Sequence, residues 1–193
     1  MKIAKLRIEG FRSLRNVSWS PGDLNVIIGP NGTGKSNLLR FLALLSVSAQ
    51  GKLGHYVQLL GGMDPIVWDG EAKSIKFTLE IEPAGNELDP ECYELELGRL
   101  GAGSSYKVEN ERLLNAHKQR KGIEKNPFKF LERHASNAVI FDENEHRFVT
   151  PEEYVSDEES LLSIASGPFT INQFIPPFQR ELSSIAVYRD LNT

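Results

Sequence analysis

A glycine-rich loop at residues 29–36 is the feature that most constrains what this chain can fold into. The loop reads Gly29-Pro30-Asn31-Gly32-Thr33-Gly34-Lys35-Ser36, which fits the pattern G-x-x-x-x-G-K-[S/T]. Before it, Leu24–Ile28 is apolar and partly β-branched, as in a strand buried on both faces of a sheet. After it, residues 35–48 carry apolar side chains at spacings that suit a mostly buried helix. A strand, a glycine loop and a helix in this order predict an α/β fold.

The residue types in this loop suit the binding of a nucleoside triphosphate. A triphosphate concentrates negative charge in a small volume, so its site needs many short N–H donors and a cation. Gly29, Gly32 and Gly34 allow the backbone to turn its N–H groups inward. Lys35 is expected to reach the β- and γ-phosphates, and the Ser36 hydroxyl is expected to be a ligand of Mg²⁺. We therefore predict that ATP and Mg²⁺ bind here.

Alternation of apolar and polar residues predicts several further strands. Two short ones are expected at residues 4–9 and 17–19, before the loop. Later strands are expected at residues 74–82, 91–97 and 104–108, with a hairpin of residues 138–141 and 147–149. One apolar and one polar face per strand is typical of an antiparallel sheet with one solvated face.

The remaining segments are predicted from composition and from proline. Residues 109–135 are polar and rich in Lys, Arg and Glu, and we expect a helix and a loop there. Residues 160–164 are predicted to form a helix. The Pro176-Pro177 pair is expected to interrupt the chain before a last helix or strand near residues 182–188.

Composition limits the setting in which the chain works. Residues are 40% hydrophobic and 25% charged, as in a soluble globular protein, and the net charge of −4 gives no overall attraction to DNA or anionic lipid. The single cysteine, Cys92, cannot form an internal disulfide, and no signal peptide or run of about 20 apolar residues is present. A cytoplasmic location is expected. No metal-ligand spacing links the four histidines, and the basic run Lys118–Lys121 is interpreted as a solvated helix face.

The opening of the chain resembles ATPases of the RecF/SMC/OLD type, including the bacterial predicted ATPases called AAA_21 or RecF-like. The resemblance rests on Leu6–Ser13, on Leu24–Ile28, and on the glycine-rich loop with its residues Asn31 and Asn37. It is strong over residues 1–48 and looser to about residue 82, and the stretch Gly61–Gly70 is similar to the AAA_21-type ATPases. The resemblance implies the N-terminal part of an ATPase head of the ABC type.

The resemblance also implies a nucleotide site that extends beyond the loop. The arginine of the Phe-Arg-Ser element lies near the nucleotide in these families, which points to Arg12. The expected nucleotide-binding residues are Arg12, Gly29, Pro30, Asn31, Gly32, Thr33, Gly34, Lys35, Ser36 and Asn37. Of these, Ser36 is also the expected metal ligand.

An ABC-type ATPase needs further parts that the chain does not show. These are a Walker B carboxylate pair, a signature loop donated to a partner's ATP and a switch histidine, and each positions groups or stabilises charge. Only Asp142-Glu143 follows an apolar run, Ala138–Phe141, and the residues after it read as a turn and a returning strand. We interpret this segment as a β-hairpin and assign no catalytic residue. Gln173 and Gln179 are candidates for a glutamine that senses Mg²⁺, and neither is assigned.

The chain is therefore expected to be one incomplete ATPase head domain over residues 1–193. The prediction divides it into a Walker A lobe with a mixed sheet (1–60), an antiparallel β-rich subdomain (70–150) and a helical or irregular continuation (151–193). Because Tyr188–Thr193 shows no cap or tail, we expect a cut inside a domain. Weak ATP binding and negligible hydrolysis by this chain alone follow from that expectation.

Three functions remain open. The first is the ATP-binding half of a RecF/SMC/OLD-like ATPase in DNA maintenance or phage defence, with the C-terminal half of the same head, a second head, and DNA or a nuclease as partners. The second is the nucleotide-binding subunit of an ABC transporter. The third is a complete small P-loop phosphotransferase that uses Asp142 and Glu143 at Mg²⁺. Phe11-Arg12-Ser13 favours the first, and antiparallel strands after the loop argue against the third, because a kinase should continue with parallel βαβ units.

Overall fold

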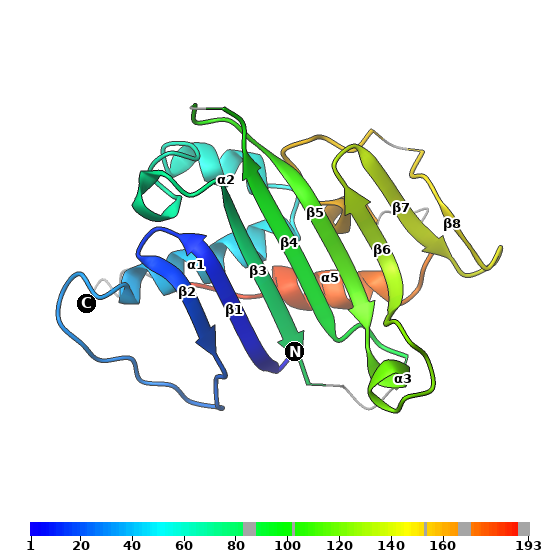
Figure 1. Ribbon diagram of the computed structural model, residues 1–193. Coiled ribbons are helices and arrows are strands. Elements are labelled where there is room, and N and C mark those ends of the chain that lie inside the picture. The colour runs from blue at the N-terminus through cyan, green and yellow to red at the C-terminus, as the bar shows by residue number, and fades with distance from the viewer. Residues whose placement is uncertain (83–87, 102, 153, 166–170, 189–193) are drawn as a thin grey trace.

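A computed structural model describes residues 1–82, 88–101, 103–152, 154–165 and 171–188. These residues form one eight-stranded sheet with the order β2-β1-β3-β4-β5-β6-β7-β8, in which every neighbouring pair is antiparallel (Figure 1). The strands are β1 (Ile3–Phe11), β2 (Leu14–Trp19), β3 (Ser74–Ile81), β4 (Cys92–Arg99), β5 (Tyr106–Asn115), β6 (Phe128–His134), β7 (Asn137–Asp142) and β8 (Arg147–Val149). The strands on either side of the glycine-rich loop in sequence therefore belong to the same layer.

Helices cover one face of this sheet, and the other face is open (Figure 1). The helices are α1 (Lys35–Ser48), α2 (Leu53–Leu59), α3 (His117–Arg120), α4 (Leu161–Ile164) and α5 (Ile175–Ser183), with a short 3₁₀ helix at Trp68–Gly70. The α1 and α5 helices pack on the covered face. The predicted helix over residues 35–48 is thus confirmed, and so is the short helix predicted at 160–164.

Alternation of side chains explains why the central strands form. In β3, Ile75, Phe77 and Leu79 are buried on the covered face, while Lys76 between them is exposed on the open face. The strands predicted over residues 4–9, 17–19, 74–82, 91–97 and 104–108 are confirmed as β1 to β5. The predicted hairpin is confirmed as β7 and β8.

A continuous row of aromatic rings joins the helices to the sheet. Phe11 of β1 packs edge-to-face on Phe41 of α1, with ring centroids 5.2 Å apart. The row continues from Phe41 to Phe77 of β3 (5.5 Å), to Tyr93 of β4 (5.6 Å) and to Phe178 of α5 (5.9 Å). Edge-to-face aromatic pairs stabilise a core beyond the burial of their area. This row fixes α1, whose first turn follows the glycine-rich loop, against the centre of the sheet.

The predicted strand over residues 24–28 is wrong. These residues have no regular secondary structure, and Leu24 and Ile28 are 87% and 88% exposed. Figure 1 shows the segment as part of a long loop that runs outside the β2 edge of the sheet. A strand is stabilised by hydrogen bonds to a neighbour, and among the described residues no strand pairs with this segment. The predicted mixed sheet is accordingly antiparallel throughout in the described residues.

Two smaller expectations are also wrong. Residues 109–135 form most of β5 and all of β6, and only His117–Arg120 within them is helical. The Pro176-Pro177 pair lies in the first turn of α5, where a missing N–H is tolerated, so the prolines begin the last helix and do not interrupt the chain before it. The expectation for the end of the chain falls on residues 189–193, which lie outside the described residues. None of the helices in the described ranges is long and apolar enough to cross a membrane.

Candidate nucleotide-binding loop

The glycine-rich loop leads directly into α1, which begins at Lys35. The helix is held in place by Leu38, Phe41 and Leu45, which are buried in the core. Gly34 precedes the helix with a φ of 98°, in the left-handed region that favours glycine. The first N–H groups of an α-helix have no intrahelical acceptor, and they carry the positive end of the helix dipole. The loop therefore delivers the chain to a helix end that is suited to an anion.

The side chain of Lys35 turns back over the loop. Its ammonium group donates to the carbonyl oxygens of Gly29 (2.6 Å) and Pro30 (2.7 Å), and it lies 3.5 Å from Thr33 Oγ1. Thr33 Oγ1 in turn donates to the carbonyl of Pro30 at 3.0 Å. The loop thus curls around a cation. A bound phosphate would be expected to compete with these carbonyls for the same ammonium group.

The remaining loop residues leave room for a ligand. Asn31, Gly32 and Ser36 are exposed, and a Cβ atom added at Gly32 would meet no heavy atom within 4 Å. By contrast, a Cβ at Gly29 would lie 3.2 Å from Thr33 Oγ1, so the glycine allows the loop to close on itself. A lysine, an exposed serine hydroxyl and an open backbone fit a triphosphate with Mg²⁺, in which Lys35 would meet phosphate and Ser36 the metal.

The turn between β1 and β2 lies against this loop. Asn37 Nδ2 donates to Ser13 Oγ at 2.9 Å, although the two residues are 24 positions apart. Arg12, which is half-buried, has a φ of 48°, and its N–H donates to the carbonyl of Ile66 at 2.8 Å. The structure therefore brings the Phe-Arg-Ser element beside the loop. Ser13 was missing from the predicted site, although the Phe-Arg-Ser element already contained the signal for it.

Asp142 occupies a hairpin turn. Its Oδ1 accepts hydrogen bonds from the backbone N–H groups of Asn144 (2.8 Å) and Glu145 (3.1 Å), and β8 pairs with β7 directly after the turn. An aspartate that accepts from the N–H groups two and three positions later is typical of a turn. The hairpin interpretation of Asp142-Glu143 is confirmed, and Asp142 uses its carboxylate within its own turn.

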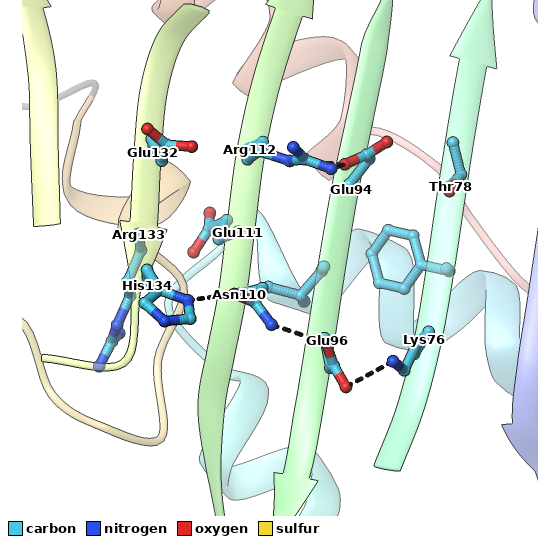
Figure 2. Close-up of a pocket in the computed structure, with 12 residues that line it drawn as sticks. Lys76, Thr78, Glu94, Glu96, Asn110, Glu111, Arg112, Glu132, Arg133 and His134 are labelled. Atoms are coloured by element: carbon cyan, nitrogen blue, oxygen red, sulfur yellow. Dashed lines mark hydrogen bonds and ion pairs between the residues drawn. The ribbon is translucent and has the colours of Figure 1, made fainter. Parts of the chain in front are cut away.

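The open face of the sheet contains a shallow cavity of about 520 Å³ (Figure 2). Side chains from four strands form a hydrogen-bonded row across it. Lys76 pairs with Glu96 (2.9 Å), Asn110 Nδ2 donates to Glu96 (2.7 Å), and His134 Nδ1 lies 2.7 Å from Asn110 Oδ1. Arg112 pairs with Glu94 beside this row. Because these groups satisfy one another, the cavity is explained as a solvated sheet face.

Other polar features of the sequence also have structural partners. In the basic run, Lys118 pairs with Glu124 (3.0 Å) and Arg120 with Glu91 (2.5 Å). Within the described parts of the chain, no group of three or more His, Cys, Asp or Glu side chains could hold a metal ion.

Cys92 and Gln179, two further candidates from the sequence, both pack within the fold. Burial raises the pKa of the Cys92 thiol to about 12, so that a reactive thiolate does not form near neutral pH. Gln179 Nε2 donates to the carbonyl of Ala49 at 2.5 Å, where α5 packs on the end of α1.

A family model described as the AAA ATPase domain matches residues 1–159. Over 43 residues, the chain is 51% identical to the cytochrome c biogenesis ATP-binding export protein CcmA 2 of Cupriavidus metallidurans. That match covers 22% of this chain and 20% of the relative, so the chain matches about a fifth of that protein's length.

A solved structure from work on ATP-driven dimerization and DNA-stimulated activation of SMC ATPases is also similar. It has a TM-score of 0.40 and 22% sequence identity, over 56% of this chain and 68% of that chain. The family model, in contrast, spans well over half of this chain and includes the glycine-rich loop. This match confirms the predicted P-loop ATPase class, and the chain therefore belongs to the AAA ATPase domain family.

Proposed function

We propose that the chain binds ATP with Mg²⁺ on Gly29–Ser36, as the nucleotide-binding part of a RecF/SMC/OLD-like ATPase. In this proposal the backbone N–H groups of the loop and the first turn of α1 hold the phosphates. Lys35 supplies positive charge to the β- and γ-phosphates, Ser36 is a ligand of Mg²⁺, and Arg12 approaches from the β1–β2 turn. Mg²⁺ would supply charge neutralisation between the phosphate oxygens.

One observation carries this proposal: the ammonium group of Lys35 turns back onto the glycine-rich loop and forms hydrogen bonds with it. Its donation to the carbonyls of Gly29 and Pro30 fixes the lysine where a triphosphate would meet it. The membership in an ATPase family supports the same ligand. Since no catalytic carboxylate is assigned, the proposal for this chain is nucleotide binding, with hydrolysis left to the intact protein.

One proposed partner follows from the exposed segment 24–28. Its apolar side chains Leu24, Val26 and Ile28 are exposed, and an exposed apolar patch of this kind is typical of a surface that another part covers. We propose that the C-terminal half of the same head packs on this segment, and that a second head closes on the bound ATP. DNA or a nuclease domain would then be the element that this closure controls, in DNA maintenance or phage defence.

The alternatives have less support. The similarity to an ATP-binding export protein covers 43 residues, which supports ATP binding and carries little information on transport. A small phosphotransferase would need Asp142 near the Mg²⁺ of the loop. Instead, Asp142 accepts hydrogen bonds from two backbone N–H groups of its own hairpin turn, and four strands lie between β1 and β7 in the sheet order.

A titration with a fluorescent ATP analogue tests the proposal. A methylanthraniloyl ATP analogue with Mg²⁺ would be titrated into the wild type and into Lys35→Ala, and the dissociation constant would be measured from fluorescence anisotropy. Because a hydrogen bond to a charged group contributes about 1.5–3 kcal/mol, Lys35→Ala should weaken binding by about 10- to 100-fold.

The matched control is Lys125→Ala, which removes an exposed lysine from the loop between α3 and β6. It changes the net charge by the same amount, so it should leave the dissociation constant near that of the wild type. Equal binding by the wild type and Lys35→Ala would rule out the loop as the phosphate site. Equal weakening by both variants would mean that the loss of one positive charge, and not the position of Lys35, weakens binding.

A further inference from the structure

We propose that Asn37 is a positioning residue of the nucleotide site. Its side-chain amide holds the Ser13 hydroxyl over Gly34, and it thereby fixes the β1–β2 turn, with Arg12, against the glycine-rich loop. This inference rests on the proposed function, which is ATP binding at residues 29–36. It assigns Asn37 a contact with the turn where the sequence had suggested a contact with the nucleotide.

The amide of Asn37 is engaged at both ends. Its Nδ2 donates to Ser13 Oγ at 2.9 Å, and its Oδ1 accepts from Arg40 Nη1 at 3.0 Å. Arg40 follows Asn37 by three positions on α1, so the two side chains lie on the same side of the helix. The helix itself therefore orients the amide, with the NH₂ group toward the turn. A direct contact of either end with phosphate would require one of these bonds to break.

The turn and the loop approach each other closely at Gly34. A Cβ atom at this position would lie 2.7 Å from Ser13 Oγ and 3.3 Å from Leu14 Cδ2. The first distance is shorter than real Cβ contacts allow, so the approach needs glycine here. Gly34 immediately precedes Lys35. The Ser13 hydroxyl thus lies beside the stretch of backbone that would present N–H groups to the phosphates.

The turn needs to be held because its backbone is strained. Arg12 has a φ of 48°, in the left-handed region that non-glycine residues seldom adopt. Such a conformation persists only where neighbouring groups fix it. The carbonyl of Ile66 holds the Arg12 N–H on one side, at 2.8 Å, and Asn37 holds Ser13 on the other. Without the amide of Asn37, the turn can relax away from Gly34 and carry Arg12 with it.

The test compares ATP binding by five variants. Asn37→Ala and Ser13→Ala each remove one side of the contact, and the double variant removes both. Ser13→Thr retains the hydroxyl, and Leu39→Ala truncates an exposed neighbour on α1 as a control. The dissociation constant of a methylanthraniloyl ATP analogue with Mg²⁺ and the midpoint of thermal unfolding without nucleotide would be measured for each.

Each single alanine variant should raise the dissociation constant by about three- to tenfold, because a bound nucleotide must then order the turn that the lost hydrogen bond had held in place. The double variant should bind no more weakly than the weaker single variant, because the two changes remove the same contact. Ser13→Thr and Leu39→Ala should bind like the wild type. Unfolding midpoints should not follow the order of the dissociation constants, so that the change in binding is separated from a change in stability.

If the losses of binding free energy in the two single variants add up in the double variant, the inference is overturned, since additivity would mean two independent contacts with the nucleotide. Wild-type binding by both single variants would also overturn it, and so would losses that follow the unfolding midpoints. Lys35→Ala separates this result from the proposed function. If Lys35→Ala alone loses binding, only the role of Asn37 fails. If Lys35→Ala binds like the wild type, the proposed function fails and the inference fails with it.

Discussion

Glu111 is a carboxylate buried at the centre of β5 that attaches α4 to the sheet. It accepts hydrogen bonds from the Tyr93 hydroxyl (3.0 Å) and from the backbone N–H groups of Leu161 (2.7 Å) and Leu162 (2.8 Å). The side chain is completely buried. Burial raises the pKa of Glu111 to about 6, and the three donors act in the opposite direction because they favour the charged form.

This buried carboxylate predicts a pH dependence of stability. The pKa of Glu111 in the folded chain, about 6, is above the ordinary value of 4.5. Its contribution to stability is therefore fully present below pH 4.5 and is lost as the pH rises through 6. Between pH 5 and pH 7, the wild type should lose about 1 kcal/mol of unfolding free energy relative to Glu111→Gln, which lacks the titrating group. Urea unfolding at both pH values measures this difference, and equal pH dependences of the two proteins would contradict the assignment.

The residues of the candidate site differ in how far the sequence could predict them. Lys35 and Ser36 follow from a local motif, because the chemistry of phosphate binding fixes their spacing from the glycines. The contact of Ser13 with Asn37 could not be predicted, since it spans 24 positions and depends on the β1–β2 turn. In the same way, Asp142 could be interpreted as a turn residue from its sequence neighbours, because its partners are only two and three positions away.

At the scale of elements, helices and strands were predicted correctly where the apolar residues followed either the helical or the alternating spacing throughout the segment. The helix at Lys35–Ser48 and the strand at Ser74–Ile81 have apolar residues at helical and alternating spacings, and both formed. The helix predicted within residues 109–135 is mostly wrong because polar composition was taken as a sign of helix. Strand β5 buries the charged Glu111, and it has a register shift opposite Glu96 and Leu97, so its alternation is interrupted.

The segment at residues 24–28 gives a prediction at the same scale. Its exposed apolar side chains should bind an apolar dye and promote self-association. The double change of Leu24 and Val26 to serine should reduce dye fluorescence and the mass measured by light scattering. Folding should be unaffected, since both side chains are exposed.

The control for this experiment is Ile123→Ser, which removes a single exposed apolar side chain from the loop after α3. It should leave dye binding nearly unchanged, because one isolated apolar residue does not form a patch. A wild-type protein that is a clean monomer and binds no dye would contradict the account of residues 24–28.

At the scale of the whole molecule, the two faces of the sheet have different roles. The covered face holds α1 through the aromatic row from Phe11 to Phe178, and the helix in turn positions the glycine-rich loop beside the β1–β2 turn. The open face carries charged groups that pair with one another. The site is therefore predicted at the start of α1, although a cavity of about 520 Å³ lies on the open face (Figure 2).

An amide NMR titration with ATP and Mg²⁺ tests this location most directly. The largest shift changes are expected at Gly29, at Asn31–Asn37 and at Ser13, and Lys35→Ala should abolish them. The backbone N–H groups of the loop should respond because they would donate to the phosphates. Shift changes centred on Glu96 and His134 of the open face, or no change at the loop at saturating ATP, would contradict it.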